Sequence, residues 1–238
     1  ALPSVMDNIA RNYNARAAEC AVFEDATVYL PQGGPDVLPD ERETVVLAAY
    51  GSRWDYLALK GLVEGLLATA KVRDVRFVRN SAGAAYHPGR CADIWVGEER
   101  LGAIGEVHPA VLANYGVKPR VVAAELDMEV LFAHRGATPL FQPLPKHPAI
   151  TRDLALVADE ATPAADIAGR ILGAAGKNLE SLALFDVYTG EHIEAGKKSL
   201  AYNLVLRAPD RTLTDEEAEG TVKKVLKALA EIGVSLRT

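Results

Sequence analysis

A small set of polar side chains near the end of the chain has the residue types that recognise a nucleic-acid base. Asp186 and Tyr188 alternate within the run LFDVYTG, and Ser199, Asn203 and Arg207 alternate within KKSLAYNLVLR. An aromatic ring stacks on an unpaired base, while a carboxylate and a hydroxyl bind its edge. The alternative is an ordinary solvated sheet face that binds nothing.

The strands predicted around these residues decide which side chains lie together. Side chains at alternate positions of a strand point to the same face. The apolar positions of the predicted strands 182–188 and 198–207 must lie under helices, so the polar set shares the uncovered face. Strict alternation also places Leu182 and Leu184 on that uncovered face, and Phe185 beneath the helices.

The second half of the chain predicts a compact order of elements. A strand over 150–158 leads to a helix whose buried face carries Ile167, Ile171 and Leu172. Thr214 and Glu217, three residues apart, form a capping box at the start of the next helix. The complete set is strand 150–158, helix 163–175, strand 182–188, strand 198–207, a helix after Thr214 and strand 234–237. This β-α-β-β-α-β order is typical of the ferredoxin-like fold.

A proline-rich joint at the start of the stretch 141–160 separates this half from a different first half. Three prolines around Lys146 and His147 exclude a helix there. We therefore expect two domains, 1–136 and 141–238. The first reads as short helices and several strands that form an antiparallel sheet, so both domains are α+β. Its predicted strands are 21–30, 43–50, 72–79, 90–96, 101–107 and 121–126, and its main helices are residues 2–13 and the segment after Asp55.

The composition excludes some classes of protein. The net charge is −6, and residues 141–238 hold 12 Lys and Arg against 14 Asp and Glu, so nucleic acid would bind locally rather than through a basic surface. No apolar run approaches the roughly 18 residues of a membrane span. Cys20 and Cys91 have no metal-ligand spacing, which favours two reduced thiols in a cytosolic protein.

Two histidines are the other candidates for chemistry. His87 and His108 each precede a proline and have Asp93 and Glu106 nearby, a set that could bind metal or transfer protons, as in a hydrolase. Their spacing fits no known ligand signature. We expect turn and packing roles for both histidines, and no metal site.

The residues just described resemble one family. The runs that carry the resemblance are HPAITRDLALV, LFDVYTG, GKKSLAYNLVLRAPDRTLTDEE and a final SLR in the second half, with ARNYNAR, VFEDATVYL, YHPGRCADI and LGAIGEVHPAVLANYG in the first. Together they are similar to the C-terminal part of the β subunit of bacterial phenylalanyl-tRNA synthetase. The resemblance covers essentially the whole chain in the right order, and the chain starts at Ala1, so we expect a portion of a longer subunit.

The resemblance implies a function. The enzyme is an α2β2 heterotetramer in the cytoplasm, in which the α subunit uses ATP and magnesium to attach phenylalanine to tRNA. The first domain then resembles a class II synthetase core without activity, and the ferredoxin-like domain binds the anticodon. The family pattern implies that Asp186, Tyr188 and Ser199 contact the first anticodon base, a guanine. Further candidates for RNA contact are Lys197, Lys198, Asn203 and Arg207.

The first domain lacks the residues that a class II active site needs. Such a site holds ATP phosphates with arginines, but the junction 123–127 offers only Glu125 and Asp127, and Glu24 and Asp25 stand on the first strand. Carboxylates repel a triphosphate unless metal intervenes. We therefore expect no catalytic residue and no cofactor in this chain. The alternative is that Glu125 and Asp127 hold magnesium.

Two further hypotheses concern partners. One alternative to RNA binding is a ferredoxin-like regulatory module that binds a small metabolite at its sheet or dimer edge. We also expect the apolar stripe of the first helix to serve partly as an interface with another protein. That stripe comprises Leu2, Val5, Met6, Ile9 and Tyr13.

Overall fold

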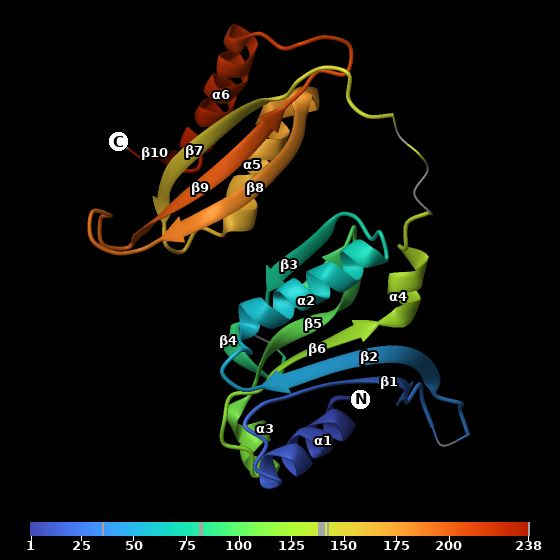
Figure 1. Cartoon of the computed structure of the whole chain (residues 1–238). Helices are drawn as coiled ribbons and strands as arrows, with labels where there is room; N and C mark the ends of the chain where they lie inside the picture. Colours follow the sequence, from blue (N-terminus) through green and yellow to red (C-terminus); the bar gives the residue numbers. More distant parts are fainter. Residues whose placement is uncertain (35, 81–82, 138–140, 142, 238) are drawn as a thin grey trace. The chain divides into compact units, whose positions relative to one another are not determined.

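The computed structural model describes residues 1–34, 36–80, 83–137, 141 and 143–237. Contacts divide the chain into two compact units, Ala1–Leu140 and Phe141–Thr238, and each is considered by itself (Figure 1). Residues 138–140, between the two expected domains 1–136 and 141–238, and Gln142 in the proline-rich joint lie outside the described residues. In the described part of the chain, no helix is long and apolar enough to cross a membrane.

The first unit is built on one six-stranded antiparallel sheet in the order β1-β2-β6-β5-β4-β3. Its strands are β1 (Cys20–Leu30), β2 (Asp40–Tyr50), β3 (Val75–Arg79), β4 (Tyr86–Val96), β5 (Glu99–Val107) and β6 (Val122–Asp127). Its helices are α1 (Leu2–Asn14), α2 (Tyr56–Thr69), α3 (Pro109–Asn114) and α4 (Met128–Ala133). The expected antiparallel α+β class is confirmed.

Two hydrophobic cores lie on the two faces of this sheet. On one face α1 packs with Val46 and Ala123, and on the other α2 and α4 pack with Ala124 and Leu126. The expected interface on α1 is wrong, because its stripe fills the first of these cores. Leu2, Val5, Met6 and Ile9 are buried there, and Tyr13 packs edge-on against Tyr50.

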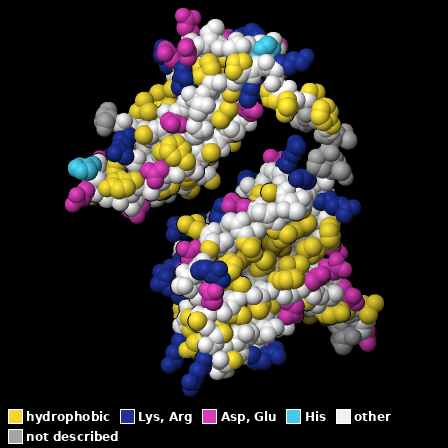
Figure 2. Space-filling model, viewed as in Figure 1, with side chains coloured by type: hydrophobic (Ala, Val, Ile, Leu, Met, Phe, Trp, Pro, Cys, Tyr) yellow, Lys and Arg dark blue, Asp and Glu magenta, His cyan; other side chains and the backbone are white. Residues whose placement is uncertain are grey.

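The helix α2 exposes more apolar surface than its pattern predicts. Leu59, Val63 and Leu67, spaced four residues apart, are buried against the sheet. Leu62 and Leu66, which precede Val63 and Leu67 in the helix, are 45% and 39% exposed. Figure 2 shows hydrophobic side chains gathered on the exposed side of this unit, over α2.

The second unit is a four-stranded antiparallel sheet in the order β10-β7-β9-β8, with both helices on one face (Figure 1). Its elements are β7 (Ile150–Asp159), α5 (Ala164–Ala175), the 3₁₀ turn η1 (Gly176–Asn178), β8 (Leu179–Tyr188), β9 (Lys197–Leu206), α6 (Asp215–Ala230) and β10 (Ser235–Leu236). The expected ferredoxin-like order is confirmed.

Local signals and packing explain this unit. The Thr214 side chain accepts from the Glu217 backbone N–H, and the Glu217 carboxylate accepts from Thr214, so the predicted capping box starts α6. Ile167 and Ile171 are buried under the sheet as expected. Leu172 is 55% exposed, which corrects its place on the buried face.

Candidate nucleic-acid interface

A bulge in β8 decides which side chains reach the uncovered face of the second sheet. Residues opposite each other on paired strands share a face. Leu182 and Leu184 lie opposite Leu204 and Tyr202, which are buried under the helices. Our placement of both leucines on the open face is therefore wrong.

The pairing register shifts between Leu184 and Asp186, and Phe185 is the extra residue. A bulge of this kind re-aims the side chains that follow it. Beyond it Asp186 lies opposite Ala201, and Tyr188 lies opposite Ser199, both on the open face. Phe185 is 59% exposed rather than beneath the helices. The strand thus turns leucines towards the helix-covered face at one end and presents polar groups on the open face at the other.

The three residues expected at the first base differ in exposure. Asp186 is exposed, the Tyr188 ring is 39% exposed, and Ser199 is only 4% exposed beside them. Neither the Asp186 carboxylate nor the Ser199 hydroxyl has a partner among the described residues. The site therefore offers an acceptor, an accessible ring face and a recessed hydroxyl, the combination that a flat base with edge donors fits.

The loop after Tyr188 holds the ring in place. The Tyr188 hydroxyl donates to the backbone carbonyl of Glu191 at 2.9 Å. Gly190 has a φ of 151°, and a Cβ there would lie 3.0 Å from the same hydroxyl. A glycine lets the loop fold back close to the phenol, so the ring is oriented before anything binds.

The cationic candidates are bound within the unit. Lys197 forms an ion pair with Glu194 at 2.7 Å, which lowers the pKa of Glu194 and raises that of Lys197. Lys198 donates to the Glu160 carbonyl at 2.9 Å. Arg207 pairs with Glu180 at 2.6 Å and also donates to the His147 carbonyl. Contact with phosphate would have to compete with these partners.

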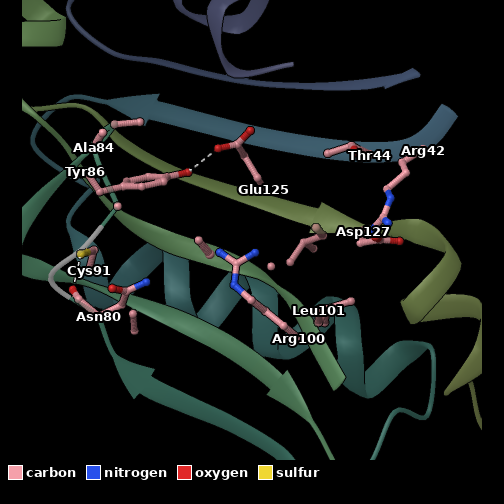
Figure 3. Close-up of a pocket in the computed structure, with 16 residues that line it drawn as sticks. Arg42, Thr44, Asn80, Ala84, Tyr86, Cys91, Arg100, Leu101, Glu125 and Asp127 are labelled. Carbon is pink, nitrogen blue, oxygen red and sulfur yellow. Dashed lines mark hydrogen bonds and ion pairs between the residues drawn. The ribbon is translucent and has the colours of Figure 1, made fainter. Parts of the chain in front are cut away.

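The first unit has a cavity of about 460 Å³ on the face that α1 partly covers (Figure 3). It is lined by Arg42, Thr44, Asn80, Tyr86, Arg100, Glu125, Asp127 and smaller residues around them. Glu125 and Asp127 reach it because β6 alternates: Ala124 and Leu126 point into the opposite core. The two carboxylates expected at this junction thus lie in one cavity.

Most polar groups that line this cavity have partners, some of them carboxylates outside the lining. Arg42 pairs with Asp40 at 2.7 Å and with Asp127 at 3.5 Å, and Arg100 pairs with Asp93 at 2.8 Å. The buried Tyr86 hydroxyl donates to Glu125 at 3.1 Å (Figure 3). Burial, together with the nearby Glu125 carboxylate, raises the pKa of Tyr86 well above its ordinary range.

Sequence reasoning missed Arg42 and Arg100 at this cavity. Arg42 alternates with Thr44 and Val46 along β2, a signal that a face assignment would have used. Arg100 sits at a hairpin whose register shifts between Ile94 and Trp95, and the pattern does not reveal that shift. Both arginines face carboxylates.

The remaining candidates have local structural contacts. The Nδ1 atoms of His87 and His108 accept backbone N–H groups of Gly89 and Ala110, so both rings close local turns. Among the described residues no group of three or more His, Cys, Asp or Glu is placed to hold a metal ion. Cys20 and Cys91 are free thiols, and burial raises the pKa of each.

Two family models match the chain. The model described as phenylalanyl tRNA synthetase beta chain CLM domain matches residues 1–128, and the ferredoxin-fold anticodon binding domain matches residues 145–237. A solved structure, the pyrrolysyl-tRNA synthetase of Desulfitobacterium hafniense, is similar over 54% of this chain and 46% of its own, with a TM-score of 0.43 and 18% identity. That similarity is too weak to support an inference.

Curated relatives agree with the family models. The phenylalanine–tRNA ligase beta subunit of Clostridium tetani is 40% identical over 237 residues, which cover 99% of this chain and 30% of the relative. The subunit from Symbiobacterium thermophilum is 42% identical over 248 residues, which cover 100% of this chain and 28% of the relative. The chain thus spans about a third or less of the length of these relatives. It belongs to the phenylalanyl-tRNA synthetase beta chain family.

Proposed function

We propose that this chain is the non-catalytic C-terminal portion of the β subunit of a cytoplasmic phenylalanine–tRNA ligase, and that its second unit binds the tRNA anticodon. The observation that carries the proposal is the open sheet face, where Asp186, Tyr188 and Ser199 meet beyond the β8 bulge. This face lies in the unit that matches an anticodon-binding model. The partners are an α subunit, in an α2β2 assembly, and tRNA with the phenylalanine anticodon.

The chemistry of the open face favours guanine as the first base. Tyr188 stacks on the base, and the Asp186 carboxylate accepts from the adjacent amino and imino N–H groups of guanine. Adenine lacks this pair of donors. Because the unit has two more acidic than basic residues and its nearby cations are already paired, base contacts carry more of the recognition than phosphate contacts.

The cavity of the first unit supports the assignment of this unit as a scaffold without catalysis. Arg42 and Arg100 are the cations that line it, and carboxylates already bind both. Glu125 and Asp127 add negative charge to the lining of the cavity, which disfavours a triphosphate there. ATP and magnesium are then used by the α subunit.

The test is a kinetic comparison in the whole synthetase on tRNA with guanine or adenine at the first anticodon position. Base stacking contributes about 1–3 kcal/mol, so Tyr188→Ala should weaken tRNA binding about 5- to 150-fold. Asp186→Ala should mainly reduce the preference for guanine over adenine. Glu219→Gln, an exposed change on the helix α6 on the other face of the sheet, is the matched control and should change neither quantity.

Two outcomes would overturn the proposal. Wild-type efficiency and discrimination in both variants would remove the open face from anticodon recognition and favour a metabolite-binding module that ignores tRNA. Phenylalanine-dependent pyrophosphate exchange by this chain alone would contradict the assignment of the first unit as inactive.

A further inference from the structure

The edge strand β1 of the first unit is uncovered on the face of the sheet where α2 packs. Phe23 lies opposite Leu47, which packs at the rim of the core under α2, so alternate residues of β1 from Phe23 share that face. All five β1 side chains on this face are exposed, namely Ala21, Phe23, Asp25, Thr27 and Tyr29. Phe23, an aromatic ring, is 76% exposed.

The apolar surface of α2 continues towards β1. Lys60 lies over the Phe77 ring of β3 at 4.4 Å, so that flank of α2 faces β3. At 100° per residue, Leu62 and Leu66 lie on the opposite flank. Since α2 packs on β5 and β6, that flank faces β2 and then β1. We call Phe23, Leu47, Leu62 and Leu66 the apolar strip; hydrophobic side chains gather over this part of the unit in Figure 2.

Unpaired carboxylates lie beyond the apolar strip on the same face. Asp25 alternates with Phe23 along β1, and Glu41 and Glu43 alternate with Leu47 along β2. Each of the three is exposed, and its carboxylate forms no hydrogen bond or ion pair with any described residue. The sequence places no lysine or arginine at the positions of β1 and β2 that share this face. The surface is therefore apolar at one end and acidic at the other.

Protection of a sheet edge explains only part of this pattern. A charged side chain on an edge strand prevents pairing with another chain, which would account for Asp25. It does not account for Glu41 and Glu43, because β2 is an interior strand. It also does not account for the exposed Phe23 ring beside two exposed leucines, and a contiguous apolar surface with a polar rim is typical of a docking site.

The spacing of the sheet fits a helix in this place. Strands lie about 4.8 Å apart, so β1 is about 10 Å from β6, on which α2 packs. The axes of packed helices are separated by about 8–10 Å. A helix along β1 would therefore lie beside α2 and complete the layer. Its apolar stripe would contact the apolar strip, and its basic side chains would pair with the three carboxylates.

We propose that this face is covered by an amphipathic helix with a lysine-bearing flank, supplied by the part of the same β subunit that this chain does not span. The chain covers only about 30% of its curated relatives. A segment of the same polypeptide has a high effective concentration, so it covers the face ahead of a separate molecule. The inference goes beyond anticodon binding and rests only on the proposal that the chain is a portion of a longer β subunit.

Carbodiimide crosslinking of the whole synthetase identifies the occupant. The reagent condenses a carboxylate with a touching lysine into an amide and is itself hydrated to a urea. We expect amides from Asp25, Glu41 or Glu43 to a lysine of the β subunit outside this chain. Links to the α subunit or to a second copy of this region would overturn the proposal. So would the absence of links while Glu194 and Lys197, which pair at 2.7 Å, do react.

Hydroxyl-radical footprinting measures how well the face is covered. Phe23 should be oxidised readily in this chain alone and be protected in the whole synthetase. Burying a whole leucine contributes about 1.5–3 kcal/mol, and Leu62 has 45% of its surface left to bury. Leu62→Gln should therefore raise the oxidation of Phe23 in the synthetase about 3- to 10-fold. Because Leu62 is exposed in this chain, the same change should leave the melting temperature of the chain alone unaltered.

Charge reversal tests the acidic end. Asp25→Lys combined with Glu43→Lys should also expose Phe23, and the effect should shrink at high salt. Glu219→Lys, an exposed change in the second unit, is the matched control. Equal oxidation of Phe23 in the chain and in the synthetase would overturn the proposal, as would protection in the chain alone that disappears on dilution. Neither result bears on Asp186 and Tyr188, whose variants test the anticodon site separately.

Discussion

The cavity face of the first unit and the open face of the second unit both carry polar groups on an antiparallel sheet. They differ in whether those polar groups have hydrogen-bond or ion-pair partners. In the cavity the arginines face carboxylates, and the Tyr86 hydroxyl donates to Glu125. On the open face the Asp186 carboxylate and the Ser199 hydroxyl are without partners among the described residues.

This difference separates a structural polar cluster from the surface that we propose binds tRNA. Paired groups stabilise the fold that holds them, whereas accessible unpaired groups exchange water for a ligand at little cost. Changes on the cavity face should therefore act on stability and leave anticodon recognition alone. Changes on the open face should alter anticodon recognition and leave stability nearly unchanged.

The largest expected effect comes from adding one methyl group below the cavity. A Cβ at Gly102 would lie 1.9 Å from the Glu125 carbonyl oxygen, because β5 and β6 approach closely there. Gly102→Ala should lower the free energy of unfolding of the first unit by about 3 kcal/mol or more, the upper end of overpacking effects. Trp54 and Trp95, the two tryptophans of the chain, both lie in this unit, so urea unfolding followed by tryptophan fluorescence reports it.

The control for this change is Gly61→Ala on the exposed side of α2. Nothing lies within 4 Å of a Cβ at Gly61. Because alanine favours a helix more than glycine does, this variant should be as stable as the wild type or more so. A Gly102→Ala chain with unchanged stability would show that the strands separate easily, and would weaken the view of this face as rigid scaffold.

The same chemical change made on both faces gives the most direct comparison. Tyr86→Phe leaves Glu125 without its donor in a partly buried site, so it should cost about 1–3 kcal/mol of stability. Tyr188→Phe removes a bond to the exposed Glu191 carbonyl, which water can replace, so it should cost less than about 1 kcal/mol. Fluorescence-detected unfolding measures the first, and circular dichroism the second.

Binding of tRNA provides a second measurement for the variants Tyr86→Phe and Tyr188→Phe. Tyr86→Phe should leave tRNA binding unchanged. Tyr188→Phe keeps the ring that we propose stacks on the base, so it should retain most of the affinity. A loss of anticodon discrimination in Tyr86→Phe would contradict the division of roles between the two faces.

Local patterns predicted much of this structure. The capping box, the polar and apolar alternation of β9, and the order of elements in the second unit depend on neighbours in sequence. The open-face position of Asp186, Tyr188 and Ser199 followed from the same alternation, although the reasoning overlooked the bulge at Phe185. Asp186 and Tyr188 lie beyond the bulge, so only the leucines before it and the bulged residue were misplaced.

What the sequence did not predict depends on register and on packing between distant segments. Arg100 and Asp93 meet across a hairpin with an irregular register, and Arg42 meets Asp127 from 85 residues away. The exposed Leu62 and Leu66 show that a helix pattern gives an apolar side, but the width that becomes buried depends on the partner surface.

The smallest expected effect is a difference in pH dependence between the two units. The pKa of Tyr86 is raised above the ordinary tyrosine value of about 10. Tyr86 therefore contributes stability to the first unit at pH values below about 10, and this contribution is lost as the pH rises above that value. In the second unit, hydrogen bonds from Arg211 and the Thr214 backbone lower the pKa of Glu217 from 4.5 to about 2. Its contribution is therefore present above pH 4.5 and lost as the pH falls towards 2.

Two variants test this pH dependence of stability. Tyr86→Phe should remove the alkaline part, and Glu217→Gln should remove the acidic part. Tyr86→Phe should flatten the alkaline limb of the first unit in tryptophan fluorescence. Glu217→Gln should speed amide hydrogen exchange in α6 at neutral pH, and this difference from wild type should shrink as the pH falls from 4.5 towards 2. Glu219→Gln, an exposed change on the same helix, is the control. Because the carboxylate of Glu217 is solvated, the effect is modest. An undiminished difference at pH 2 would mean that Glu217 acts through packing rather than through its charge.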